Sequence, residues 1–580
     1  MKKLIALLLA LVMVLSLVAC STKEKTPEVS ETPSGDSSTP ATEEKSGEET
    51  PAATEGDANA ESETPMVIQW DQTNTTDLLE PPYMDGTLSY HTYFLWSRLW
   101  VADQSKQPTD PDYYVWHVGS GWEANEDATE FKLTVRDDAV WTDGEPVTAD
   151  DVAFTIMANI MDPTSAYPAS YKQIEGYEDL TNGKADTLSG MVVDGNTITF
   201  TLSAPNANFR PNPFVLPAHC FEGISWNDMS TAEYWKNPVT CGPYRVSETS
   251  FPDYFKMTRF ENYFGKPAGI KNVTAISFET SGVDAAVASM IAGESDITSR
   301  TVTSSGVIAN QIADGNPDCV IKSMYSNDYR ALIFNMGNRT DGKDKAALVN
   351  DASARLAISL LVDEDTIGHY VAGEACKIPG NPINPNVPSD WNEAEKSLDL
   401  EKAKSLLDAA GWNYDDEIDI LCYYTDQVSR DVLEIIKADA AKIGVKVNIN
   451  VVAENPGAAI YDDRNFDLLF FMNGGSTTSP AFGVGQYLGT DAENYVTMTE
   501  WIPEKYAPLY DALVAAEDGS AEQAAATKAL YAANQEDVLI IPIYVQSMIM
   551  TYNTAHIYVP ETAFDYFDNN FDLDQWQMLH

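Results

Sequence analysis

The spacing of apolar residues predicts alternating strands and helices along most of the chain. Residues Phe131–Val135 and Ile198–Leu202 alternate apolar and polar positions, as strands do when one face is buried. Between them, Thr148 and Asp151 have the spacing of a capping box, with Asp in place of the usual Glu. An apolar face at Val152 and every fourth residue after it follows directly, so a helix is expected to begin here.

The clearest run of elements lies in the second half of the chain. A helix is expected between Asp399, which is placed to cap it, and Gly411, which is placed to end it. A strand at 418–420, a helix over 428–443 and a strand at 445–451 then form a strand–helix–strand unit, which implies parallel strands with a right-handed crossover. Other elements are expected at 284–292 and 352–362 (helices) and at 466–471 and 539–544 (strands).

The N-terminus has the pattern of an export signal. Two lysines precede an apolar run, Leu4–Val18, that is too short for the roughly 30 Å hydrocarbon core of a membrane. The run ends in LVAC, which resembles the lipobox of bacterial lipoproteins, so we expect a signal peptide at 1–20 and lipid attachment to Cys20. This places the protein outside the cytoplasm, anchored to the outer face of the bacterial cytoplasmic membrane, in the Gram-positive manner.

Residues 21–64 are rich in Thr, Ser, Glu, Pro and Gly, and predict a disordered acidic tether. The 580-residue chain has 88 Asp+Glu against 36 Lys+Arg, a formal net charge of −52. Nucleic-acid binding is therefore excluded, because affinity for phosphate backbones comes mainly from Lys and Arg. The charge favours a soluble, self-repelling molecule, and we expect a monomer.

The residue patterns of common catalytic and metal sites are absent from the sequence. The six histidines show no HExxH spacing, and there is no GxSxG, GxxxxGK[ST] or CxxC motif. We therefore expect neither an enzyme nor a cofactor or metal site; His369 is an unconvincing nickel ligand. Beyond Cys20, five cysteines remain, which we expect to be mostly free and buried, although Cys220 and Cys241 could also form a disulfide.

Five segments, in order, resemble family 5 extracytoplasmic solute-binding proteins, the oligopeptide-, dipeptide- and nickel-binding components of ABC importers. The segments are WTDGEPVTADDVAFT (141–155), NPVTCGPY (237–244), NYFGKP (262–267), ARLAISLLVD (354–363) and LEKAKSLLDAAGW (400–412). Single matches of this length are weak, but five in the family's order are a specific signal.

The resemblance implies an α/β, two-lobed fold of the periplasmic-binding-protein type (type II, large peptide-binding subclass), with mixed sheets flanked by helices. Crossovers between the lobes are expected near Tyr329–Asn335 and Leu539–Tyr544. Lobe I would comprise 65–332 plus 540–580, and would be discontinuous, while lobe II would comprise 333–539. A peptide or similar polar solute would be enclosed by hinge closure and delivered to a permease and its ATPase.

One departure from the family bears on the ligand. In peptide-binding relatives the strand matching 466–471 runs into G-W-x-x-D, whose Asp pairs with the peptide ammonium; here Asn473 and Ser476 fall on the Trp and the Asp. A ligand without a free N-terminus, such as a capped peptide or an oligosaccharide, is thus an alternative, with Asn473, Ser476 and Thr478 offering polar contacts. A surface receptor or adhesin without a transport role is a further alternative. The family's cleft contacts also suggest Tyr93, Trp96 and Trp391 as ligand-binding residues.

Overall fold

The computed structural model describes residues 62–579, with longer gaps at 71–77, 84–89, 373–397 and 474–502 and several shorter ones. The predicted signal peptide, with Cys20, and the predicted tether up to residue 61 lie outside the described residues. No helix in the part of the chain that the structure describes is both long and apolar enough to cross a membrane.

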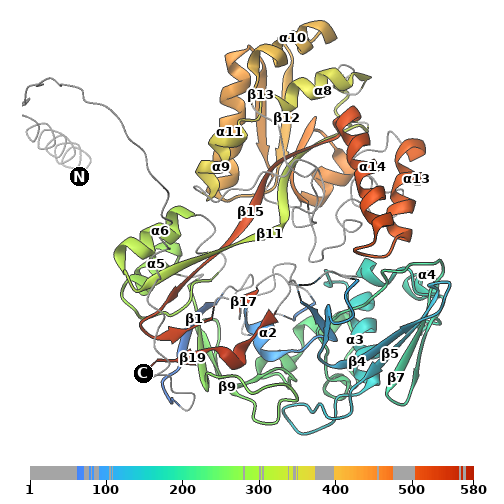
Figure 1. Ribbon diagram of the computed structural model, residues 1–580, viewed down its shortest axis with the longest axis vertical. Helices are drawn as coiled ribbons and strands as arrows, with labels where there is room; N and C mark the ends of the chain where they lie inside the picture. Colours follow the sequence, from blue (N-terminus) through green and yellow to red (C-terminus); the bar gives the residue numbers. More distant parts are fainter. Residues whose placement is uncertain are drawn as a thin grey trace, which may run out of the picture. The chain divides into compact units, whose positions relative to one another are not determined.

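The largest sheet has five strands in the order β13-β12-β14-β11-β15. Its strands are β11 (Cys319–Phe334), β12 (Glu417–Cys422), β13 (Lys446–Val451), β14 (Leu468–Asn473) and β15 (Ile540–Asn553). Of these, β11, β12, β13 and β15 are labelled in Figure 1. β12 is parallel to both β13 and β14, whereas β11 is antiparallel to β14 and β15. The predicted strand–helix–strand unit and its parallel pairing are therefore confirmed.

Helices bury their apolar faces in the core of this sheet, which is built from residues between Tyr329 and Val545. α10 (Leu400–Ala410) begins at Asp399, whose side chain accepts a hydrogen bond from the backbone N–H of Lys402, and ends at Gly411 in the left-handed region (φ 73°). Both ends are as predicted, because the caps are local. The other described helices around this core are α8 (Ala352–Ser359), α9 (Glu364–Ala372), α11 (Gln427–Lys442), the π-helix η6 (Ala458–Asp463), α13 (Pro503–Ala515) and α14 (Ala521–Asp537).

β11 and β15 are the two longest strands that the structure describes, and they run side by side over most of their length (Figure 1). One half of β15, from Ile540 to Val545, belongs to the core of the five-stranded sheet. Its other half carries Met550 into a second core, and the backbone N–H of Thr551 donates to Thr298 Oγ1 at 2.9 Å. The same strand therefore belongs to two separate hydrophobic cores.

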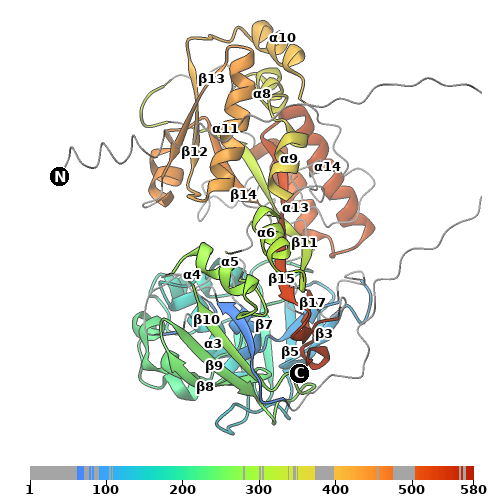
Figure 2. The same ribbon diagram turned by 90° about the vertical axis from the view of Figure 1, so that its left-hand side faces the viewer.

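The second core packs against a four-stranded sheet in the order β1-β10-β9-β8, whose strands β8, β9 and β10 are seen together in Figure 2. Its strands are β1 (Met66–Trp70), β8 (Tyr244–Ser250), β9 (Tyr254–Arg259) and β10 (Asn272–Ser277). β1, from the start of the described chain, pairs in parallel with β10. The short helix α2 (Tyr90–Leu95) contributes Tyr93, Phe94 and Leu95 to this core.

A third core lies between an antiparallel sheet and the helix α3 (Ala149–Met161). The sheet has the order β4-β5-β7-β6, formed by β4 (Gly119–Ala124), β5 (Glu130–Val135), β6 (Met191–Asp194) and β7 (Thr197–Thr201). At the start of α3 the predicted capping box is present: Thr148 Oγ1 accepts from Asp151 N–H, and an Asp151 carboxylate oxygen accepts from Thr148 N–H.

The remaining described elements are short. They are the strands β2 (Trp100–Ala102), β3 (Tyr114–Trp116), β16 (Ile557–Tyr558), β17 (Phe564–Asp565), β18 (Asn570–Phe571) and β19 (Gln577–Met578), the helices α4 (Tyr177–Thr181), α5 (Val283–Ile291) and α6 (Gly306–Gly315), and the 3₁₀ turns η1 (Pro168–Tyr171), η2 (Ala218–Phe221), η3 (Trp226–Thr231), η4 (Glu233–Lys236) and η8 (Leu573–Gln575). α5 corresponds to the helix predicted at 284–292, and Gly293 follows it with φ 71°.

Candidate functional site

The carboxyl ends of β12 and β14 meet at one edge of the five-stranded sheet. Because the two strands are parallel neighbours, β12 ends at Cys422 beside the point where β14 runs on to Asn473. At this edge Tyr329 of β11 is in register with Asn473 on one side and Val545 of β15 on the other. Ligand sites in α/β sheets form where parallel strands end, so functional side chains are expected here.

Two tyrosines follow directly after β12 and reach across this edge. The hydroxyls of Tyr423 and Tyr424 are 2.5 Å apart, and the backbone N–H of Met472 donates to Tyr424 Oη at 3.0 Å. Burial raises the pKa of Tyr424 far above its ordinary value, even with the positive charge of Arg330 beside it. The Tyr424 phenol is therefore neutral at physiological pH.

Arg330 stands next to these tyrosines on β11. Its backbone is in register with Met472 of β14 and Tyr544 of β15, and its Cζ lies 3.7 Å from the centroid of the Tyr424 ring. The residue is only 7% exposed. Among the described residues, neither Nε nor Nη1 of Arg330 has a hydrogen-bond partner. A buried cation with unfilled donors is thus the most unusual chemical feature of this edge.

The predicted binding residues Tyr93 and Trp96 lie in the second hydrophobic core. Trp96 is 1% exposed, and its ring packs against Trp235 at a centroid distance of 6.0 Å. Tyr93 is also buried, with its ring 5.4 Å from that of Phe214 and the Arg98 guanidinium nearby. Core packing explains both positions, and their contact with a ligand stays a prediction.

Of the other predicted site residues, the structure describes only the backbone of Asn473. Asn473 is the last residue of β14, at the edge described above, but its side chain is not described. Trp391, Ser476 and Thr478 lie outside the described residues. Neither Arg330 nor Tyr424 was predicted as a site residue. The signal for Arg330 is a charged residue inside the otherwise apolar run Tyr329–Phe334.

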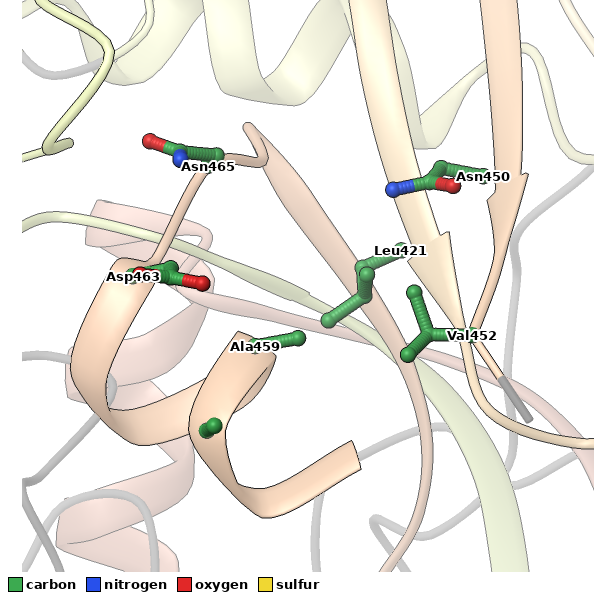
Figure 3. A pocket seen from close by; sticks show the side chains of 7 residues that line it. Leu421, Asn450, Val452, Ala459, Asp463 and Asn465 are labelled. Atoms are coloured by element: carbon green, nitrogen blue, oxygen red, sulfur yellow. The ribbon is translucent and has the colours of Figure 1, made fainter. Parts of the chain in front are cut away.

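A pocket of about 400 Å³ opens between β12, the end of β13 and η6 (Figure 3). Leu421, Val452 and Ala459 supply its apolar wall, and Asn450, Asp463 and Asn465 its polar groups. Leu421 pairs with Leu469, and Arg330 pairs with Met472, three residues further along the same strand. Because successive side chains of a strand alternate between the two faces, the pocket lies on the face of the sheet opposite to Arg330. Asn465 Oδ1 already accepts from Asp341 N–H at 2.9 Å, so this polar group helps to hold a loop.

One group of three potential metal ligands occurs among the described residues. Asp143, His219 and Cys220 offer ligand atoms that all lie within 4.8 Å of one another. His219 Nε2 and Asp143 Oδ2 are already 2.9 Å apart, in a contact that joins the turn before α3 to η2. The side chain of His369, in α9, is not described.

The described cysteines are free. Cys220, Cys241, Cys319 and Cys422 carry no disulfide, and all but the half-buried Cys220 are buried. This confirms the expectation of mostly free, buried cysteines for these four residues. Cys376 lies outside the described residues.

Comparison with known proteins identifies the class. The sequence profile described as "Bacterial extracellular solute-binding proteins, family 5 Middle" matches residues 114–495. The chain belongs to this family.

Individual relatives agree with this assignment. The nickel-binding periplasmic protein of Escherichia coli (strain K12) is 21% identical over 398 residues, which cover 65% of this chain and 70% of that protein. The periplasmic oligopeptide-binding protein OppA of the same organism is 26% identical over 357 residues, covering 58% of this chain and 62% of that protein, less than two thirds of its length. The crystal structure of the ABC transporter substrate-binding protein CtaP from Listeria monocytogenes matches with a TM-score of 0.69 at 17% identity, covering 89% of this chain and 99% of that one.

Family membership confirms several of the predictions. The fold is the mixed α/β fold of the two-lobed family 5 binding proteins, and the family is described as one of bacterial extracellular solute-binding proteins. Proteins of this family are binding proteins and not enzymes.

Proposed function

We propose that this protein is the solute-capturing component of an ABC importer, and that it holds a peptide or a polar solute of similar size between two lobes. The observation that carries this proposal is the β11–β15 pair, in which one strand contributes Ile540–Val545 to one core and Met550 to another. A strand that belongs to two cores and is paired along most of its length with a second long strand is suited to act as a hinge, since bending the pair moves each core as a unit.

On this proposal the lobes have the boundaries expected from the sequence. Lobe I would consist of residues 65–332 and 540–580, and lobe II of residues 333–539. Contacts made by the ligand with both lobes would favour the closed state, which the permease would recognise. The ligand would undergo no chemical change.

The proposal includes the cellular setting. Lipid on Cys20 would anchor a monomer to the outer face of the cytoplasmic membrane, and residues 21–64 would give it reach toward the permease. Permease and ATPase are the proposed protein partners. The two relatives are a nickel-binding and an oligopeptide-binding protein, so a metal complex is a further ligand class to test, beside peptides and oligosaccharides.

Ligand binding by a purified fragment, residues 62–580, tests the proposal. Residues 62–580 would be screened by thermal shift against short peptides, oligosaccharides and nickel–histidine complexes, and positive compounds would be measured by calorimetry. We expect one class to bind with 1:1 stoichiometry and to raise the melting temperature. Failure of every class to bind, in protein first unfolded and refolded to remove carried-over ligand, would contradict the proposal and favour a receptor or adhesin without a transport role.

A further inference from the structure

A carboxylate, an imidazole and a thiol converge where two distant segments of the chain meet. Asp143 lies in the turn before α3, and His219, which is 76 positions further along the chain, lies in η2 next to Cys220. The ligand atoms of the three side chains all lie within 4.8 Å of one another. None of these residues belongs to the candidate site at the edge of the five-stranded sheet.

Hydrogen bonds hold both segments in place around this cluster. Asp143 Oδ1 accepts from the backbone N–H of Glu145 at 3.1 Å, while Oδ2 lies 2.9 Å from His219 Nε2. The Ala218 backbone N–H donates to Asp151 Oδ1 at 2.8 Å, which ties η2 to the first turn of α3. The cluster therefore stands on a fixed backbone, with the carboxylate of Asp151 close by.

The three side chains are accessible and lie between two hydrophobic cores. The side chains of Asp143 and His219 are 34% and 35% exposed, and Cys220 is half-buried and forms no disulfide. Trp141, whose ring centroid is 6.4 Å from that of His219, belongs to the third core, whereas Cys220 packs against the second. A ligand bound here would therefore connect the second core to the third.

We propose that Asp143, His219 and Cys220 bind a divalent transition-metal ion of the zinc type. One oxygen, one nitrogen and one sulfur atom are ligands that Zn²⁺ takes, whereas Mg²⁺ and Ca²⁺ take oxygen. Ligand atoms around a tetrahedral zinc ion lie about 3.3–3.8 Å apart, so the present spacings change by about 1 Å or less when the ion binds. Water completes the fourth position.

The bound ion acts as a clip between the turn before α3 and η2. It replaces the direct contact of Asp143 with His219 by bonds to a common centre and adds Cys220 to the connection. Because the ion binds only where the three ligands are brought together by folding, it stabilises the folded chain. This inference does not depend on the proposed function, since the solute is bound elsewhere.

Cobalt absorption spectroscopy tests the site, because a cysteine sulfur bound to Co²⁺ gives a thiolate-to-metal charge-transfer band that carboxylates do not give. Purified protein stripped with a chelator would be titrated with Co²⁺ and then with Zn²⁺. We expect one equivalent of Co²⁺ to produce the band and Zn²⁺ to abolish it. Cys220→Ser and Cys220→Ala should lack the band and should bind Zn²⁺ at least about 10-fold more weakly. The control Cys319→Ala, which removes a different free cysteine, should keep the band.

Thermal unfolding with and without Zn²⁺ separates loss of the site from loss of the fold. The metal-free Cys220 variants should melt close to the metal-free wild type, because the contact of Asp143 with His219 remains. Zn²⁺ should raise the melting temperature of the wild type and of Cys319→Ala more than that of the Cys220 variants. Absence of the charge-transfer band in the wild type, or its persistence in the Cys220 variants, would overturn the inference. Equal affinity of Zn²⁺ for the wild type and both Cys220 variants would also overturn it, as adventitious binding to surface carboxylates.

Discussion

Arg339 Nη2 lies 2.7 Å from Asp419 Oδ2, in a pair whose side chains are 2% and 6% exposed. Arg339 Nη1 also donates to Asp467 at 3.0 Å, so one guanidinium joins the loop after β11 to β12 and to the start of β14. Burial alone would raise the pKa of Asp419, but hydrogen bonds from Asn448, Lys343 and Arg339 outweigh it and hold that pKa below its ordinary value. This cluster fastens three strands of the five-stranded sheet at the end opposite the candidate site.

Replacing Arg339 by Met should therefore destabilise the fold without affecting the site. We expect a loss of about 3–5 kcal/mol in the free energy of unfolding, because two buried carboxylates lose a guanidinium, while Asp419 keeps a cationic partner, Lys343. Urea denaturation measures the change. The control is Lys184→Met, which removes a pair with Asp179 in which both side chains are exposed, and should cost less than about 1 kcal/mol. Equal effects of the two changes would refute a special role for the buried cluster.

His91 should make stability depend on pH. Its ring is buried between Trp70 and Phe255, and burial lowers its pKa to about 3. The unfolded chain takes up a proton near pH 6.5 and the folded chain does not, so stability is fully present above pH 6.5 and is lost as pH falls toward 3. The loss from this one group should approach about 1.4 kcal/mol per pH unit.

His91→Phe tests that assignment, because it keeps an aromatic ring and removes the proton site. Urea denaturation at several pH values between 7.5 and 4.5 should show a shallower fall in stability for the variant than for the wild type. Identical slopes for the two proteins would mean that His91 is not the source of acid sensitivity.

Replacing Asp151 at the start of α3 should destabilise the fold more than replacing Thr148. Thr148→Ala removes one cap and should cost about 1 kcal/mol. Asp151 also accepts from Trp141 Nε1 at 3.3 Å and from the Ala218 backbone N–H at 2.8 Å, so Asp151→Ala leaves buried donors unfilled and should cost more. Thermal unfolding of both variants gives the order; the reverse order would contradict the connecting role of Asp151.

If the sequence resemblance places position 476 correctly, Ser476→Asp should increase affinity for peptides with a free ammonium group, because it adds a carboxylate where peptide-binding relatives are expected to have one. Calorimetry with unmodified tripeptides measures the gain, and Thr477→Asp is the control for added charge at a neighbouring position. A gain shared by both variants, or found in neither, would show that position 476 does not meet the ligand.

Local signals in the sequence were sufficient to predict some of the helices. Asp399 and Gly411 bound α10, and Gly293 follows α5, because caps and left-handed glycines act within a few residues. The parallel pairing of β12 and β13 also followed from the intervening helix, since short connections restrict the topology.

The pairing of strands that lie far apart in the chain could not be predicted from the sequence. The crossover expected at Tyr329–Asn335 overlaps only the end of a 16-residue strand, Cys319–Phe334. That strand pairs with β15, which lies more than two hundred residues further along the chain. The candidate site shows the same limit. Arg330 meets Tyr424 only because β11, β14 and β12 are neighbours in the sheet, whereas Tyr93 and Trp96, which lie in an aromatic cluster of the sequence, are core residues in the structure.

Small-angle X-ray scattering with and without bound solute tests the central claim most directly. If two lobes close around the solute by bending β11 and β15, a bound solute should make the protein more compact. Saturating the fragment 62–580 with a compound whose binding calorimetry has established should therefore lower its radius of gyration. An unchanged radius of gyration at saturation would contradict capture by hinge closure.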